Sequence, residues 1–234
     1  MAAAKGDLAS AGSKKIPFQR EPENVSPRGL FDQVEPKGSR KFLRAAVSAF
    51  SGRGYHATTT RDIAALVGSS PAGIYTYYAT KADLLFEIAM ISHEYIQKVM
   101  DEALASADDP ASRVAAMVRA SVTYHAEEHV LASVVNHDFR HLDVTRLAKV
   151  LKIRKQISQS VRDEVQAGID AGVFHVDHVE GAAVAVLRLV DVASWYNERG
   201  SMTPEQLADI YVALVLQMLG ASDGADERQT AVNG

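Results

Sequence analysis

The sequence Gly68-Ser-Ser-Pro-Ala-Gly-Ile-Tyr-Thr-Tyr-Tyr-Ala-Thr-Lys81 places small side chains at the start of a short predicted helix and three tyrosines behind them. Ser70 can cap this helix, and Pro71 suits its first position, where a missing N–H leaves no hydrogen bond unmade. The reverse order would suit a helix that only fills a core. The narrow front therefore predicts a helix end that enters a confined space on another molecule.

A second short helix is predicted just before this stretch, in TTTRDIAALVG (58–68). Threonines can cap it, Asp62 suits its first turn, and Gly68 can end it at the C′ position. Two short helices joined by a short turn that contains glycine are typical of a helix-turn-helix, whose second helix enters the major groove of DNA. In this arrangement Ile74 and Tyr78 face the domain core. A three-helix cap in which the tyrosines only pack is the alternative.

The rest of the chain shows helical periodicity without strand alternation, so we expect an all-α fold. Residues 1–36 have no periodicity and predict a disordered tail, and Ser39 is the expected N-cap of a helix in SRKFLRAAVSAF (39–50). The later helices are expected at 81–106, 110–128, 130–141, 143–171, 179–197 and 203–219.

These boundaries divide the chain into an N-terminal and a C-terminal domain. The first is a three-helix DNA-binding domain with the helix-turn-helix, over residues 37–80. The second is a six-helix ligand-binding and dimerisation domain over residues 81–220, followed by a flexible tail over residues 221–234.

The net charge of −4 hides an uneven distribution along the chain. Residues 38–85 contain six basic and two acidic side chains, which gives this segment a charge of +4. Such a segment on an acidic body suggests an anionic partner, although a chance fluctuation gives the same count. The absence of cysteine excludes a thiolate metal site and a thiol nucleophile, and no apolar run approaches a membrane span. We expect a cytoplasmic, nucleoid-associated protein with no cofactor and no membrane partner.

The run AAVSAFSGRGYHATTTRDIAALVGSSPAGIYTYYATKADLL (45–85) resembles the DNA-binding domain of TetR-type transcriptional repressors. The shared features include Gly54-Tyr55, Thr60-Arg61 and the Ile74-Tyr75 pair. One departure is Tyr78, where the family more often has phenylalanine. The resemblance implies a homodimer that binds double-stranded operator DNA through three N-terminal helices. It also implies a larger helical domain that dimerises and binds a small-molecule effector, which releases the DNA.

The resemblance also implies the DNA contacts, position by position. The residues expected to contact the DNA backbone are Thr60, Arg61, Tyr75, Tyr77 and Lys81. The residues expected to lie nearest the base edges are Ser70, Pro71, Ala72 and Thr76. Further candidates at this face are Arg40, Arg44, Thr59 and Gly73. Because long polar side chains are few at the helix front, we expect thymine methyl contacts and DNA shape to carry much of the specificity.

The last two predicted helices, 179–197 and 203–219, have more apolar surface than one small domain can bury. A four-helix bundle with two helices from each subunit would cover it, and a central helix pair within a monomer is the alternative. The candidate dimer residues are Val184, Leu187, Asp191, Trp195, Ile210, Leu214 and Met218.

Two further stretches, VVNHDFRHLD (134–143) and SWYNERGSMTPEQLADIYVALVLQML (194–219), resemble the KstR-type branch of the family. That resemblance implies a response to acyl-CoA thioesters or related lipid and sterol breakdown intermediates; an unrelated hydrophobic, multidrug-type compound is the alternative. The candidate lining of an apolar cavity is Tyr95, Met100, Met117, Tyr124 and Phe139. Arg140 or Arg188 would meet a carboxylate, thioester or phosphate, whereas core packing and an Arg188–Asp191 ion pair are the structural alternatives.

An H-x-x-E-H match at His125, Glu128 and His129 raises a remote alternative, a zinc-dependent hydrolase. Histidines four residues apart on one helix share a face and can chelate a metal. A catalytic zinc also needs a third ligand and an open position for water, and nothing in the sequence supplies them. We therefore expect no metal site and no enzyme.

Overall fold

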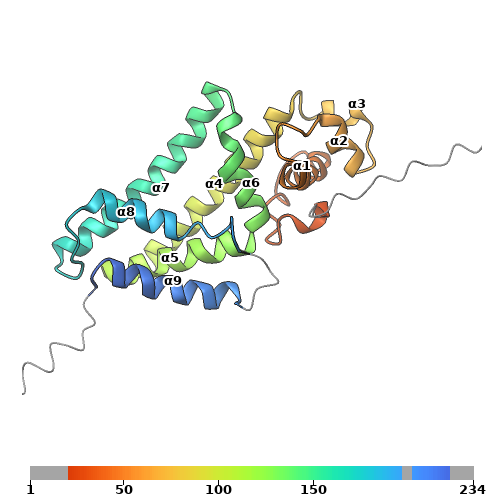
Figure 1. Ribbon diagram of the computed structural model, residues 1–234. Coiled ribbons are helices and arrows are strands. Elements are labelled where there is room, and N and C mark those ends of the chain that lie inside the picture. The colour runs from red at the N-terminus through yellow and green to blue at the C-terminus, as the bar shows by residue number, and fades with distance from the viewer. Residues whose placement is uncertain (1–20, 197–201, 222–234) are drawn as a thin grey trace, which may run out of the picture.

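The computed structural model describes residues 21–196 and 202–221, and within these ranges the chain is all-helical, as predicted (Figure 1). The predictions for residues 1–20, residue 197 and residues 222–234 lie outside the described residues. The α-helices are α1 (Arg40–Arg53), α2 (Thr60–Leu66), α3 (Pro71–Tyr75), α4 (Lys81–Ala105), α5 (Pro110–Glu127), α6 (His129–Asp138), α7 (Val144–Asp170), α8 (Val179–Leu189) and α9 (Pro204–Met218). Short 3-10 helices span Pro22–Asn24, Lys37–Ser39 and Phe139–His141.

Local capping chemistry sets where most helices begin. Side-chain oxygens of the residue before the helix accept a backbone N–H at Thr59, Ser70, Thr80, Asp143 and Thr203. The predicted cap at Ser39 is wrong. A 3-10 helix already precedes α1 there, so Ser39 has helical backbone angles and its hydroxyl donates to the carbonyl of Pro36 over 2.8 Å.

The helix predicted over 179–197 is shorter in the structure, where α8 ends at Leu189. The chain then turns, with the N–H of Val192 donating to the carbonyl of Val190 over 3.0 Å. Both valines are buried, so the apolar run is satisfied by packing without helical continuation. The turn carries Asp191 to within 3.1 Å of the amide nitrogen of Asn136 on α6.

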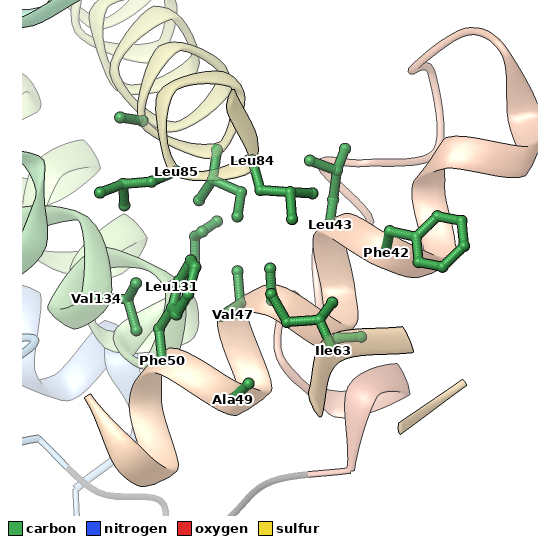
Figure 2. Close-up of a cluster of buried hydrophobic side chains, with 14 of the residues drawn as sticks. Phe42, Leu43, Val47, Ala49, Phe50, Ile63, Leu84, Leu85, Leu131 and Val134 are labelled. Atoms are coloured by element: carbon green, nitrogen blue, oxygen red, sulfur yellow. The ribbon is translucent and has the colours of Figure 1, made fainter. Parts of the chain in front are cut away.

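The first hydrophobic core lies between α1, α2, α4 and α6 (Figure 2). Phe50 of α1 and Ile63 of α2 are buried in it together with Leu84 of α4. Leu131 and Val134 of α6 complete the same cluster. The core therefore continues across residue 81, where the sequence predicts a domain boundary, and joins the three-helix unit to the larger domain.

The N-terminal segment (residues 21–36) differs from the predicted disordered tail. Val25 and Phe31 are fully buried in the first core, and the backbone N–H of Arg28 donates to Glu128 Oε1 over 2.8 Å. Val25 follows the 3-10 helix in a bend and Phe31 lies in a turn, so these two anchors give no periodic signal. The segment lies across the contact between the two domains.

The second hydrophobic core lies in the larger domain, where α5 packs between α4 and α9 and α7 packs on α8 (Figure 1). Met117 and Val122 of α5 are buried there with Val165 of α7 and Val215 of α9. None of the described helices is long and apolar enough to cross a membrane.

Candidate functional site

The two helices of the predicted helix-turn-helix are both present, as α2 and α3. Gly68 follows α2 with a φ of +61°, in the left-handed region that favours glycine, and allows the sharp turn. Ser70 caps α3 and Pro71 occupies its first position, as predicted. Ile74 and Tyr78 face the core, also as predicted, and burial raises the pKa of the Tyr78 hydroxyl. These inward side chains fix which side of α3 faces outward.

The outward side of α3 is narrow at its front and carries hydroxyl groups behind. Ser70, Pro71 and Ala72 are exposed. Tyr75 is 54% exposed, and its hydroxyl lies 3.0 Å from the hydroxyl of Thr60 at the start of α2. Two hydroxyls on one surface can donate to neighbouring phosphate oxygens.

Arg61 adds a positive charge beside this hydroxyl pair. It is exposed and makes no ion pair with any residue that the structure describes. Its neighbour Asp62 pairs instead with Arg53 over 3.3 Å. A guanidinium without a counterion, next to two hydroxyls, suits a phosphate of the DNA backbone.

Lys81 has a different role from the predicted phosphate contact. Its Nζ donates to the carbonyls of Tyr55 (2.7 Å), Thr58 (2.9 Å) and His56 (3.2 Å), and lies 4.4 Å from the centre of the Tyr55 ring. An ammonium group has three donors, and all three are used within the protein. Lys81 therefore holds the loop between α1 and α2 against the start of α4.

Arg40 and Arg44, also predicted at the DNA face, bind the N-terminal segment instead. Arg40 donates to the carbonyl of Val34 over 2.7 Å and pairs with Glu35 over 3.0 Å. Arg44 forms an ion pair with Asp32. Their charges are satisfied inside the protein, which leaves less of the +4 segment for DNA than the charge count indicates.

The remaining candidates at this face differ in how far their polar groups are used within the protein. Thr76 and Thr59 are exposed, but the Thr59 hydroxyl donates to Asp62 over 2.6 Å in the cap of α2. Gly73 is half-buried behind Ser70. Tyr77 is exposed, although its ring lies 5.8 Å from that of Phe42.

A cavity of about 280 Å³ lies within the larger domain, between α4, α5, α6, α7 and α8. Its apolar lining includes Ile96, Met100, Ile157, Leu187 and Val190. Its polar lining consists of Ser92, His93, Ser121, Tyr124, His125, Asn136, Arg154, Ser158, Arg188 and Asp191. A concave site that combines apolar walls with converging polar groups suits a small molecule, and its polar share is large here.

Three of the predicted cavity residues line it, namely Met100, Tyr124 and Arg188. Met117 lines a smaller neighbouring cavity. The other three lie elsewhere, for different reasons. The Tyr95 hydroxyl accepts a hydrogen bond from Arg28, Phe139 lies behind the cavity wall, and Arg140 is exposed on a 3-10 helix.

Sequence reasoning missed a hydrogen-bonded network on the cavity wall. Arg154 Nη1 on α7 donates to His93 Nε2 over 3.0 Å and to Asn136 Oδ1 over 3.1 Å. The amide nitrogen of Asn136 then donates to Asp191 over 3.1 Å. Asp191 lies 3.9 Å from His125 Nε2. The network connects five helices or turns around one cavity.

Burial sets the protonation of His93 in this network. Its pKa is lowered to about 4, mainly by desolvation and in smaller part by the positive charge of the nearby Arg154. The neutral ring donates from Nδ1 to the carbonyl of Ala89 over 2.7 Å, so Nε2 is the acceptor for Arg154. Burial likewise lowers the pKa of His125 and of Arg154.

The seven candidate dimer residues separate into two groups. Asp191 and Leu187 line the cavity, and their place in the dimer interface stays a prediction. Val184 lines the cavity and is also exposed. The remaining four, all exposed apolar side chains, are Trp195, Ile210, Leu214 and Met218.

The histidines of the H-x-x-E-H match do not share one helix face. Helix α5 ends at Glu127 and α6 begins at His129, so the chain breaks at Glu128 between the two histidines. Glu128 is fully buried and accepts the N–H of Arg28. No group of metal-binding side chains is present among the residues that the structure describes. The geometric premise of a zinc site is therefore wrong.

Known proteins resemble both domains. A family described as "Bacterial regulatory proteins, tetR family" matches residues 42–88, and one described as "Tetracyclin repressor-like, C-terminal domain" matches residues 107–219. The HTH-type transcriptional repressor KstR2 of Rhodococcus jostii is 26% identical, with 81% of this chain and 96% of the relative covered.

Solved structures show the same fold. A bacterial regulatory protein of the tetR family from Rhodococcus RHA1 is 33% identical with a TM-score of 0.76, covering 80% of this chain and 99% of that one. AibR in complex with isovaleryl coenzyme A and operator DNA is 21% identical with a TM-score of 0.70, and the match covers 76% of this chain and 97% of AibR. From its helix-turn-helix to its C-terminal domain, the chain belongs to the TetR family of bacterial transcriptional regulators.

Proposed function

We propose that this protein is a homodimeric repressor whose two α3 helices bind successive major grooves of an operator. The observation that carries the proposal is the outward face of α2 and α3. A narrow helix front lies beside the Thr60–Tyr75 hydroxyl pair and Arg61, which has no ion-pair partner among the residues that the structure describes. Major grooves on one side of B-DNA repeat every 34–36 Å, so a symmetric dimer would hold its recognition helices about that far apart.

A ligand in the cavity would control this binding through α4. The helix begins at Lys81, directly after the helix-turn-helix, and reaches the cavity at Ser92, Ile96 and Met100. An effector that fits the cavity better in the state that cannot bind DNA shifts the population towards that state. Its effect is limited to the difference between its affinities for the two states.

We infer that the effector is a hydrophobic lipid or sterol catabolite, such as an acyl-CoA thioester. KstR2 of Mycobacterium tuberculosis, a solved structure that is 23% identical with a TM-score of 0.75, is described as a ketosteroid transcriptional regulator, which supports this class. The mixed lining of the cavity suits a ligand with an apolar body and a polar end. AibR, a fold neighbour, was solved with isovaleryl coenzyme A and operator DNA together. The flexible, apolar Met100 would also suit an unrelated hydrophobic compound of the multidrug type.

The test of DNA binding uses the duplex that lies beside the gene for this protein. We expect Arg61→Ala to weaken binding to specific and non-specific duplexes alike, because a phosphate contact carries no sequence information. The slope of log affinity against log salt should fall by roughly one unit. Fluorescence anisotropy across a salt titration measures both.

The matched control for this test is Lys155→Ala, which removes one exposed positive charge from the middle of α7. We expect it to leave affinity and salt slope unchanged. Failure of the wild-type protein to retain any double-stranded oligonucleotide at low salt would contradict the proposed function.

A further inference from the structure

One guanidinium group that lines the cavity has no direct counterion in the described ranges 21–196 and 202–221. Arg154 is half-buried and lines the cavity, yet within the described part of the chain it makes no ion pair. Both hydrogen bonds that it forms go to neutral groups, His93 and Asn136. Charged groups that lose contact with water are usually paired, so this arginine is in an incomplete environment.

The surroundings of Arg154 hold its guanidinium in one orientation. The two hydrogens of Nη1 are used by His93 and Asn136, at 3.0 and 3.1 Å. The Phe139 ring lies under the group, with its centre 4.9 Å from the guanidinium carbon. The edge formed by Nε–H and Nη2–H has no partner among the described residues. This edge is one of the two that bind a carboxylate with two parallel hydrogen bonds.

The local charge around this edge is positive. Arg188 lines the cavity and Arg140 lies near enough for its charge to act on Arg154. Asp191 supplies the opposing negative charge, but Asn136 stands between it and the arginine. Two arginines, Arg154 and Arg188, therefore line the cavity with one carboxylate, Asp191, and a further anion would balance their charge.

We propose that Arg154 recognises a carboxylate on the effector, binding it through Nε–H and Nη2–H while the apolar body of the ligand lies against Ile96, Met100 and Leu187. The inference rests on the proposed function in one respect, that this cavity is the effector site. Among lipid and sterol catabolites it selects apolar carboxylic acids over their CoA thioesters, and it makes Arg154 the residue that determines specificity. Because the donor edge is already oriented, little rotamer entropy is lost on binding.

The first test varies the ligand and leaves the protein unchanged. Octanoate and cyclohexanebutanoate are compared with the matching primary alcohols and amides, and with octanoyl-CoA, by thermal shift and isothermal titration calorimetry. We expect the two acids to bind about 10- to 100-fold more tightly than the alcohols and amides, because only the acids form charge-assisted hydrogen bonds. Equal affinity of acid and alcohol would overturn the proposal, and so would binding of the thioester alone.

The second test varies the arginine. We expect Arg154→Gln and Arg154→Lys to weaken acid binding about 10- to 100-fold, since glutamine lacks the charge and lysine lacks the paired donors. Binding of the matching alcohols should stay within about twofold of wild type, a result that general damage to the cavity would not give. Lys155→Gln, a neighbouring exposed change of the same charge, is the control and should bind acids normally.

The outcome for DNA separates this inference from the function on which it rests. The same proteins are titrated with the operator duplex in the absence of ligand. A protein that binds the duplex but responds to no acid would overturn the carboxylate inference and leave the repressor function standing. A protein that binds an acid through Arg154 but retains no duplex would contradict the repressor function and leave the cavity assignment standing.

Discussion

At the scale of single residues, one ammonium group joins the loop between α1 and α2 to the start of α4. Lys81 Nζ donates to three backbone carbonyls of that loop, from Tyr55 to Thr58. Tyr55 and Thr58 of this loop are themselves buried. The loop precedes α2, so the position of the helix-turn-helix depends on this side chain.

We expect Lys81→Met to lower the free energy of unfolding by about 2 kcal/mol, because partly buried carbonyls lose charge-assisted hydrogen bonds. Urea denaturation of the variant and of the control Lys155→Met measures the difference. The same variants, titrated with DNA at several salt concentrations, decide between two roles for Lys81. If Lys81→Met is as stable as the wild type but lowers the slope of log affinity against log salt by about one unit, Lys81 contacts a DNA phosphate, as the sequence predicts.

The cavity shows which single residues a sequence can and cannot identify. Arg154 stands in the basic run Lys152–Lys155, where charge alone does not reveal which side chain points inward. Helical spacing carries the missing signal, because Val150 and Val161 lie one and two turns away on the same side of α7 and are both buried. Arg140, by contrast, stands in a 3-10 helix, where the period of 3.6 residues does not apply.

At the scale of single elements, the end of α7 depends on one glycine. The chain folds back after α7, and the Phe174 ring covers Gly168 so closely that a Cβ atom there would overlap it. Phe174 is fully buried in the second core. We expect Gly168→Ala to lower the free energy of unfolding by about 1–3 kcal/mol through this overlap, although alanine favours helix by about 1 kcal/mol.

A second glycine provides the control for that measurement. Gly181 lies in α8, and the nearest atom to a Cβ built there is 3.4 Å away. Gly181→Ala should therefore raise the free energy of unfolding by about 0.5–1 kcal/mol. If the Phe174 contact determines the effect, urea denaturation shows a lower free energy of unfolding for Gly168→Ala and a higher one for Gly181→Ala. Stabilisation at both positions would show that the overlap is relieved at little cost.

Helix starts were predictable from sequence where a capping side chain acts locally, as at Ser70 and at Thr59, one of the threonines before α2. Features set by tertiary packing were not. The end of α8 at Leu189 depends on Asp191 reaching a residue on another helix. The N-terminal segment is ordered by Val25 and Phe31 entering a core made by other elements. Neither contact leaves a periodic trace in the local sequence.

At the scale of the whole molecule, three connections join the DNA-binding face to the cavity. Helix α4 spans both, and the first core continues from α1 to Leu131 of α6 (Figure 2). The third is the N-terminal segment, where Arg28 pairs with Glu127 and donates to the Tyr95 hydroxyl over 2.8 Å. The Tyr95 ring lies 5.6 Å from that of Tyr124, which lines the cavity. A change at the cavity wall therefore has a packed route to α1.

The outer side of α9 carries an apolar stripe. One side of the helix packs on α5 (Figure 1), while Ile210, Leu214 and Met218 recur every four residues on the opposite side. The first two are 45% and 46% exposed. A stripe of this kind suits an isologous contact with the same helix of a second subunit.

We expect Leu214→Glu combined with Ile210→Glu to convert a dimer into a monomer, because two carboxylates would be buried in an apolar contact. Operator affinity should fall about 10- to 100-fold, since the two half-sites are then bound independently. Sedimentation velocity measures the first effect and fluorescence anisotropy the second. Leu151→Glu on α7 is the control, because Leu151 is also 46% exposed but lies on a different helix. A wild-type protein that sediments as a monomer at micromolar concentration would show that there is no stable subunit contact. A double variant that remains dimeric would show that the contact lies elsewhere on the protein.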